Sequence, residues 1–131
     1  MHAMTKMFLM LSGLNGFLAV ALGAFAAHGL RARLTPDLLN TFQTGVQYHM
    51  YHSLALLAVA ILCSQYSVAT SLRVSGLAFI IGIILFSGSL YALSLSGIRW
   101  LGVITPLGGL AFLVGWAALC WFALGLATAS E

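Results

Sequence analysis

The sequence predicts an all-α fold: an integral membrane four-helix bundle with a short amphipathic interfacial helix between spans one and two. Hydrophobic residues make up 62% of the 131 residues and charged residues only 5%, which is too little polar surface for a water-soluble domain. The apolar residues fall into four long runs, and a chain of this composition satisfies its backbone in lipid as helices. The short chain leaves room for a single transmembrane domain over residues 1–131.

The first run covers residues 7–27, and these 21 residues would form a helix about 31 Å long at about 1.5 Å per residue. That length crosses the hydrocarbon core of a bilayer. Lys6 before the run and the small residues Ala24 and Ala26 within it also resemble a cleavable signal peptide. Because the run is longer than the usual apolar region of a signal peptide, we expect a helix that is retained.

The stretch after the first span carries charges and the start of another helix. Thr35, Pro36 and Asp37 are typical of a helix N-terminus, with a capping hydroxyl, a proline in the first turn and an acid near the positive end of the dipole. Apolar residues then recur at helical spacing, which predicts an amphipathic helix over about 36–44, lying in the membrane interface. An early extension of the second span explains the same residues. The sequence leaves both alternatives open.

The other three runs are each long enough to cross the membrane. They cover about residues 46–63, 74–95 and 101–124. Four crossings place the N-terminus, the second loop and the C-terminus on one side, here called the N-terminal side. The first and third loops share the other side, here called the first-loop side. Small residues four apart, such as Ala78 and Gly82, predict close packing between the helices.

Polar side chains of all four spans gather toward the first-loop side. Unsatisfied polar groups are costly in hydrocarbon, so such groups face one another, water or a ligand. We therefore predict a polar pocket at this membrane face that binds a small ligand, a lipid headgroup or a partner protein. Its predicted lining is His28, Gln47, His49, His52, Ser89, Tyr91 and Thr105. Asn15 lies apart from this cluster, and Trp116 is interpreted as an interfacial anchor or lipid-facing bulk.

Three histidines raise the possibility of a metal-dependent membrane enzyme. His49 and His52 are three residues apart and His28 comes from the same side, so together they could hold a metal ion or pass a proton. Hydrogen bonds to neighbouring helices explain the same residues. No pattern identifies a catalytic residue, and we expect no metal, no cofactor and no enzymatic activity.

A small transporter or channel subunit is the other alternative. Ion-coupled transporters usually bury a carboxylate, whereas the acids here are Asp37 in a loop and Glu131 at the terminus. A path across the membrane would have to use Asn15 and Ser12, the remaining polar groups of the first span. The scattered positive charges suit membrane flanks and exclude nucleic-acid binding. The expected partners are the lipid bilayer and either a second copy or another membrane protein.

Four sequence blocks resemble a known family. They are GAFAAHG at 23–29, TGVQYH at 44–49 followed by His52, FSGSLY at 86–91, and TPLGG at 105–109 followed by Gly115 and Trp116. In this order the blocks resemble the domain of unknown function 423 family of small bacterial membrane proteins, which is similar to the eukaryotic transmembrane protein 256 group. Ala26 departs from a frequent glycine of the family. The resemblance implies a multi-pass fold in the bacterial inner (plasma) membrane, and it brings no established activity.

Overall fold

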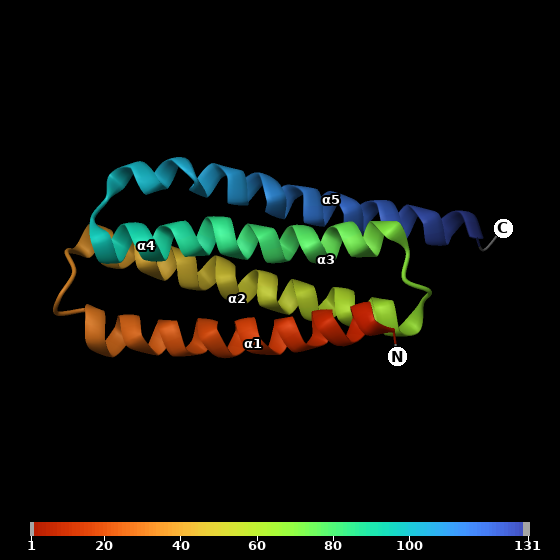
Figure 1. Ribbon diagram of the computed structural model, residues 1–131, viewed down its shortest axis with the longest axis horizontal. Helices are drawn as coiled ribbons and strands as arrows, with labels where there is room; N and C mark the ends of the chain where they lie inside the picture. The colour runs from red at the N-terminus through yellow and green to blue at the C-terminus, as the bar shows by residue number, and fades with distance from the viewer. Residues whose placement is uncertain (1, 130–131) are drawn as a thin grey trace.

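Four long helices lie side by side in the computed structural model (Figure 1), which describes residues 2–129 and the side chains of residues 2–126. Each helix is long and apolar enough to cross a membrane, and the crossings are Ala3–Leu30, Pro36–Gln65, Thr70–Ser96 and Arg99–Leu126. No strand occurs between residues 2 and 129. The predicted all-α fold with four spans is confirmed. Glu131 lies outside the described residues.

Three of the four crossings contain a change of helix type. The elements in order are α1 (Ala3–Phe25), the π-helical η1 (Ala26–Leu30), α2 (Pro36–Gln65), α3 (Thr70–Gly82), the π-helical η2 (Ile83–Ser87), α4 (Gly88–Ser96), the 3-10 helix η3 (Arg99–Val103) and α5 (Thr105–Ala129). A π turn holds one residue more than the α-helical repeat accommodates, so it rotates the side chains that follow it. The third crossing therefore presents different faces before and after η2.

The second crossing is one continuous helix from its first residue, Pro36. Residues 36–44 form its first turns and no separate interfacial helix, so the structure has the early extension that the sequence left open. The cap is as predicted, because the Thr35 hydroxyl accepts a hydrogen bond from the backbone N–H of Leu38 at 3.4 Å. Gly45 lies inside the helix and does not have a positive φ, so the helical hydrogen bonds continue through this stretch without interruption.

This extension changes where the histidines of the second crossing lie. His49 and His52 fall near the middle of a helix of 30 residues, whereas a helix beginning at about residue 46 would carry them in its first turns. The polar groups of α2 consequently reach into the interior of the bundle and are not confined to its end.

The two inner positions of the bundle are taken by α2 and the third crossing, with α1 and α5 outside them (Figure 1). α1 packs along α2, α2 packs along α3 and α4, and α3 packs along α5. The two outer helices bury a smaller share of their residues than the two inner ones. Their remaining surface is apolar, as expected for helices that face lipid.

Glycines bring the third crossing and α5 into close contact. A Cβ atom on Gly108 would overlap the backbone of Phe86, and a Cβ atom on Gly82 would overlap the ring of Phe112. The predicted role of Gly82 in close helix packing agrees with this geometry. Lipid supplies little hydrophobic drive for helix association, so packing of this kind contributes much of the stability.

Candidate functional site

Two buried histidines of α2 lie at the centre of a set of hydrogen bonds between the helices. His49 and His52 are each 4% exposed. They occupy neighbouring turns of α2 but contact different helices, because His49 bonds to α1 and α4 and His52 bonds to α5. Each ring can therefore be assigned a protonation state from its partners.

His49 joins α1 to α4. Its Nε2 atom lies 2.9 Å from Oδ1 of Asn15, and its Nδ1 atom lies 2.9 Å from the hydroxyl of Tyr91. The Asn15 amide nitrogen donates to the carbonyl of Leu11 at 2.8 Å, so Oδ1 faces the imidazole as an acceptor. A neutral ring with its proton on Nε2 satisfies both contacts, donating to Asn15 and accepting from the Tyr91 O–H.

His52 carries its proton on the other nitrogen. Its Nδ1 atom lies 2.8 Å from the backbone carbonyl oxygen of Tyr48, which can only accept, so Nδ1 is the donor. Its Nε2 atom then accepts from the indole N–H of Trp116 at 3.1 Å. The imidazole also stacks on the ring of Phe112, with centroids 3.5 Å apart and planes 8° apart. Both nitrogens and one ring face are thus occupied by protein.

These contacts leave no imidazole lone pair free in the interior. The Nδ1 lone pair of His49 accepts from Tyr91, and the Nε2 lone pair of His52 accepts from Trp116. A metal ion would have to displace one of these donors to bind. His28 is exposed in η1. No group of three His, Cys, Asp or Glu side chains that could hold a metal occurs among the residues that the structure describes.

Hydroxyl groups make further bonds between crossings. The hydroxyls of Ser89 and Thr105 lie 2.6 Å apart and join α4 to α5. Ser87 donates to the carbonyl of Gly45 at 2.7 Å, which joins η2 to α2. Every crossing is therefore tied to at least one neighbour by a side-chain hydrogen bond near the polar cluster.

The structure brings together five of the seven residues predicted to line a polar pocket. His49, His52, Ser89, Tyr91 and Thr105 all take part in the hydrogen bonds above. The other two, His28 and Gln47, are exposed on the outer surface. The five internal residues bond to protein groups, so a ligand there would have to compete with existing hydrogen bonds.

Two members of this arrangement were not predicted from the sequence. Asn15 was placed apart from the cluster, yet its amide oxygen faces His49. Trp116 was interpreted as an anchor or lipid-facing bulk, yet its indole nitrogen bonds to His52 while the residue as a whole is 44% exposed. The available signal was the position of Asn15 in the middle of an apolar run, where an amide requires a partner.

Comparison with known proteins places the chain among small membrane proteins. A family model described as "Protein of unknown function (DUF423)" matches residues 22–109. The UPF0382 membrane protein YwdK of Bacillus subtilis is 50% identical over 111 residues, which cover 85% of this chain and 90% of that protein. A UPF0382 membrane protein of Haemophilus influenzae is 45% identical, with 90% and 94% covered. The UPF0382 inner membrane protein YgdD of Escherichia coli is 39% identical, with 88% of each covered. No solved structure matches the chain.

Proposed function

The chain belongs to the DUF423 family of proteins of unknown function, and we propose that this multi-span membrane protein is a non-catalytic module that pairs with a second copy of itself through one face of α2. The proposal rests on one observation, a row of exposed polar side chains on a helix that crosses the membrane. The internal hydrogen bonds described above supply the rigid frame that presents this row.

The exposed face of α2 follows a regular spacing of three and four residues. Its members, here called the α2 stripe, are Asn40, Gln43, Gln47, Tyr51, Leu54, Ala58, Ile61 and Gln65. The half toward the first-loop side is polar and most of the other half is apolar. Gln47 lies only two residues before the buried His49, about 3 Å along the helix axis. Its carboxamide is therefore at nearly the same depth as the interior hydrogen bonds.

Carboxamides at this depth favour a protein partner over lipid. The side-chain amides of Gln43 and Gln47 make no hydrogen bond to another described residue. An amide without a partner is costly in hydrocarbon, and side-chain amides promote association of membrane helices for this reason. Pairing of α2 with another helix would satisfy them.

A second copy of this chain can supply the hydrogen-bond partners that these amides lack. A carboxamide is both donor and acceptor, so two identical glutamines can bond to each other. A two-fold axis along the membrane normal places identical stripes face to face at equal depth. Ala58 in the apolar half is small enough to let the two helices approach closely. A different partner would need its own amides at the matching depth.

The internal geometry does not favour the rival functions. The hydrogen bonds that start at Tyr91 pass through His49 and Asn15 and end at the backbone carbonyl of Leu11. This series does not extend across the described bundle, so it offers no continuous route for an ion or a proton. The occupied histidine nitrogens likewise offer no lone pair for a catalytic metal.

Disulfide crosslinking in the native membrane tests the pairing. In a background with Cys63→Ala and Cys120→Ala, Ala58→Cys should give a disulfide-linked dimer on mild oxidation. Leu113→Cys is the matched control, because Leu113 is 66% exposed on α5, away from the stripe. Equal crosslinking at the two positions, or none at Ala58→Cys, would contradict pairing through α2.

A second measurement tests the role of the amide. Polar contacts between membrane helices contribute about 0.6 to 1.7 kcal/mol, so Gln47→Leu should weaken dimerisation in lipid about threefold to eighteenfold. Gln65→Leu, at the other end of the same stripe, should change it much less. Energy transfer between labelled copies in liposomes measures both. A different outcome is that the unmodified chain does not self-associate, but another protein co-purifies with it and is lost in Gln47→Leu. That result would contradict pairing with a second copy and identify the other protein as the partner of the α2 stripe.

A further inference from the structure

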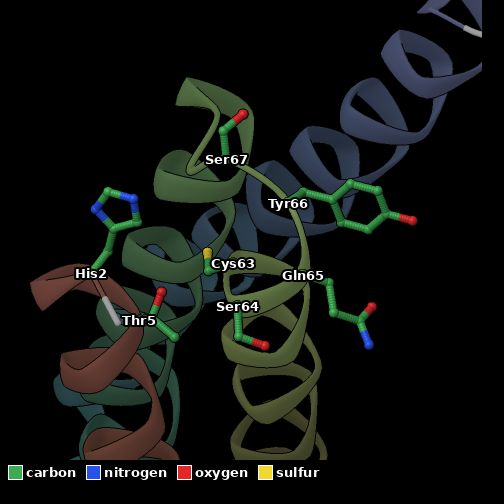
Figure 2. A pocket seen from close by; sticks show the side chains of 7 residues that line it. All are labelled: His2, Thr5, Cys63, Ser64, Gln65, Tyr66 and Ser67. Atoms are coloured by element: carbon green, nitrogen blue, oxygen red, sulfur yellow. The ribbon is translucent and has the colours of Figure 1, made fainter.

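The N-terminal side of the bundle has a hollow that shares one residue, Gln65, with the α2 stripe. A cavity of about 530 Å³ lies where α1 begins and α2 ends (Figure 2), lined by His2, Thr5, Cys63, Ser64, Gln65, Tyr66 and Ser67. A second cavity of about 450 Å³ shares His2 and Ser67 and adds Arg73 to the wall. The two cavities together are here called the N-terminal cleft.

Thr5 places an unsatisfied hydroxyl in this cleft. The residue is 2% exposed, and its Oγ1 is the one buried side-chain oxygen or nitrogen without a hydrogen-bond partner in the described part of the chain. Figure 2 shows this oxygen directed toward the space between His2 and Cys63. A buried polar group without a partner costs about 1–3 kcal/mol. A ligand that accepts a hydrogen bond from Thr5 would recover that free energy.

The N-terminus of α1 faces the cleft. α1 follows His2, and it has neither a side-chain cap nor an acid in its first turn. The first backbone N–H groups of a helix have no partner within it, and they lie at the positive end of the helix dipole. Such an end favours an anion.

One side chain of the cleft wall adds positive charge. Arg73 lines the second cavity, whereas the exposed Lys6 lines neither cavity. Asp37 is the one acid among residues 2–129, and it lies at the start of α2 on the opposite side of the bundle. An anion in the cleft would therefore meet the Thr5 hydroxyl and Arg73 without a nearby carboxylate from the described residues, although the last turn of α2, the negative end of its dipole, also borders the first cavity.

We propose that the N-terminal cleft binds a phosphate group, with the Thr5 hydroxyl and the Arg73 guanidinium donating to its oxygens and the start of α1 stabilising its charge. Arginine and backbone N–H groups at helix N-termini are common phosphate ligands. Lys6 and Arg73 flank apolar spans, so the cleft lies at the level of lipid headgroups. The phosphate can belong to a phospholipid or to a soluble anion, and the chemistry of the cleft is the same for both.

The test uses the full chain purified in a neutral detergent. Calorimetric titration with inorganic phosphate measures the soluble anion. Native mass spectrometry counts retained phosphatidylglycerol against diacylglycerol, which lacks the phosphate. Retention of phosphatidylglycerol without a response to inorganic phosphate assigns the site to a lipid headgroup, whereas a saturable response to inorganic phosphate assigns it to the phosphate group in either form. Binding of neither probe, or equal retention of both lipids without a phosphate response, overturns the proposal.

Variants localise the binding. Thr5→Val and Arg73→Gln should each weaken it at least about tenfold, as expected for loss of a hydrogen bond to a charged group. Thr5→Ser keeps the hydroxyl and should retain binding, which separates loss of the ligand from loss of the fold. The matched controls lie on the first-loop side: Thr44→Val, whose hydroxyl already donates to the carbonyl of Asn40 at 3.0 Å, and Arg33→Gln, which changes the net charge equally. Weakening in the controls as large as in the test variants overturns the proposal.

Discussion

The indole nitrogen of Trp116 donates a hydrogen bond to Nε2 of His52 at 3.1 Å, and this contact joins α5 to α2 inside the bundle. Trp116 has only one donor and His52 only one free acceptor, so the bond satisfies both side chains at once. Together with the Tyr48 carbonyl on Nδ1, it holds His52 as one neutral tautomer.

Trp116→Phe should destabilise the protein by about 1 kcal/mol or more, because it leaves Nε2 of His52 without a donor in the interior. Reversible unfolding in mixed detergent micelles measures the change. Trp121→Phe is the control, since Trp121 is 72% exposed and should tolerate the replacement. Equal stability of the two variants would show that the hydrogen bond contributes nothing.

Tyr91→Phe removes the donor to Nδ1 of His49 and should also destabilise the fold by about 1 kcal/mol. Tyr48→Phe deletes the same hydroxyl from a residue of α2 that lies outside the α2 stripe and is 38% exposed, and it should leave the unfolding free energy within about 0.5 kcal/mol. In a double-mutant cycle, Asn15→Leu and Tyr91→Phe should be non-additive because both act on one imidazole. Strict additivity would mean that His49 does not link α1 to α4.

Gly108→Ala should be the most destabilising of the glycine replacements, since the added Cβ would overlap backbone atoms of Phe86 that cannot rotate away. Overpacking of this kind typically costs about 1–3 kcal/mol. Gly16→Ala meets open space and should be neutral or stabilising by up to about 1 kcal/mol through helix propensity. Thermal unfolding in the same detergent compares the two. If Gly108→Ala leaves the unfolding temperature unchanged, α5 and the third crossing are further apart than in this structure.

Protein purified without a histidine tag should contain far less than one equivalent of zinc, copper or iron, because the lone pairs of His49 and His52 already accept hydrogen bonds. Elemental analysis by mass spectrometry measures the content. A stoichiometric metal that disappears in His52→Gln would contradict the assigned tautomers and restore the metal-enzyme alternative.

Hydropathy and length were sufficient to predict the four spans, because a bilayer imposes a nearly fixed length on each apolar helix. The start of α2 was ambiguous, since the cap at Thr35 begins either a surface helix or the span itself. The structure distinguishes the two, because Gly45 lies inside one continuous helix and packs against Leu90 and Tyr91, which are far from it in the sequence.

The hydrogen-bond partners within the cluster could not be predicted from the sequence either, because they also join residues that are far apart along the chain. The types of the residues predicted that His49 and His52 would be satisfied, but the partners Asn15 and Trp116 come from two different crossings. Their alignment depends on how the crossings pack against one another, which leaves no signature in the hydropathy pattern. The unpaired hydroxyl of Thr5 was likewise invisible, because its surroundings are set by three separate segments.

The π-helical segment η2 divides the third crossing into two parts with different neighbours: α3 packs mainly on α5, whereas α4 packs on α2. An uninterrupted α-helix over the same residues would turn α4 by about 100° relative to α3. Ser89 and Tyr91 would then leave their partners, although every residue would keep its chemical identity. The hydrogen bonds of α4 therefore depend on the type of helical turn at residues 83–87 more than on the side chains there, and lipid-facing Ile84 should accept almost any apolar replacement.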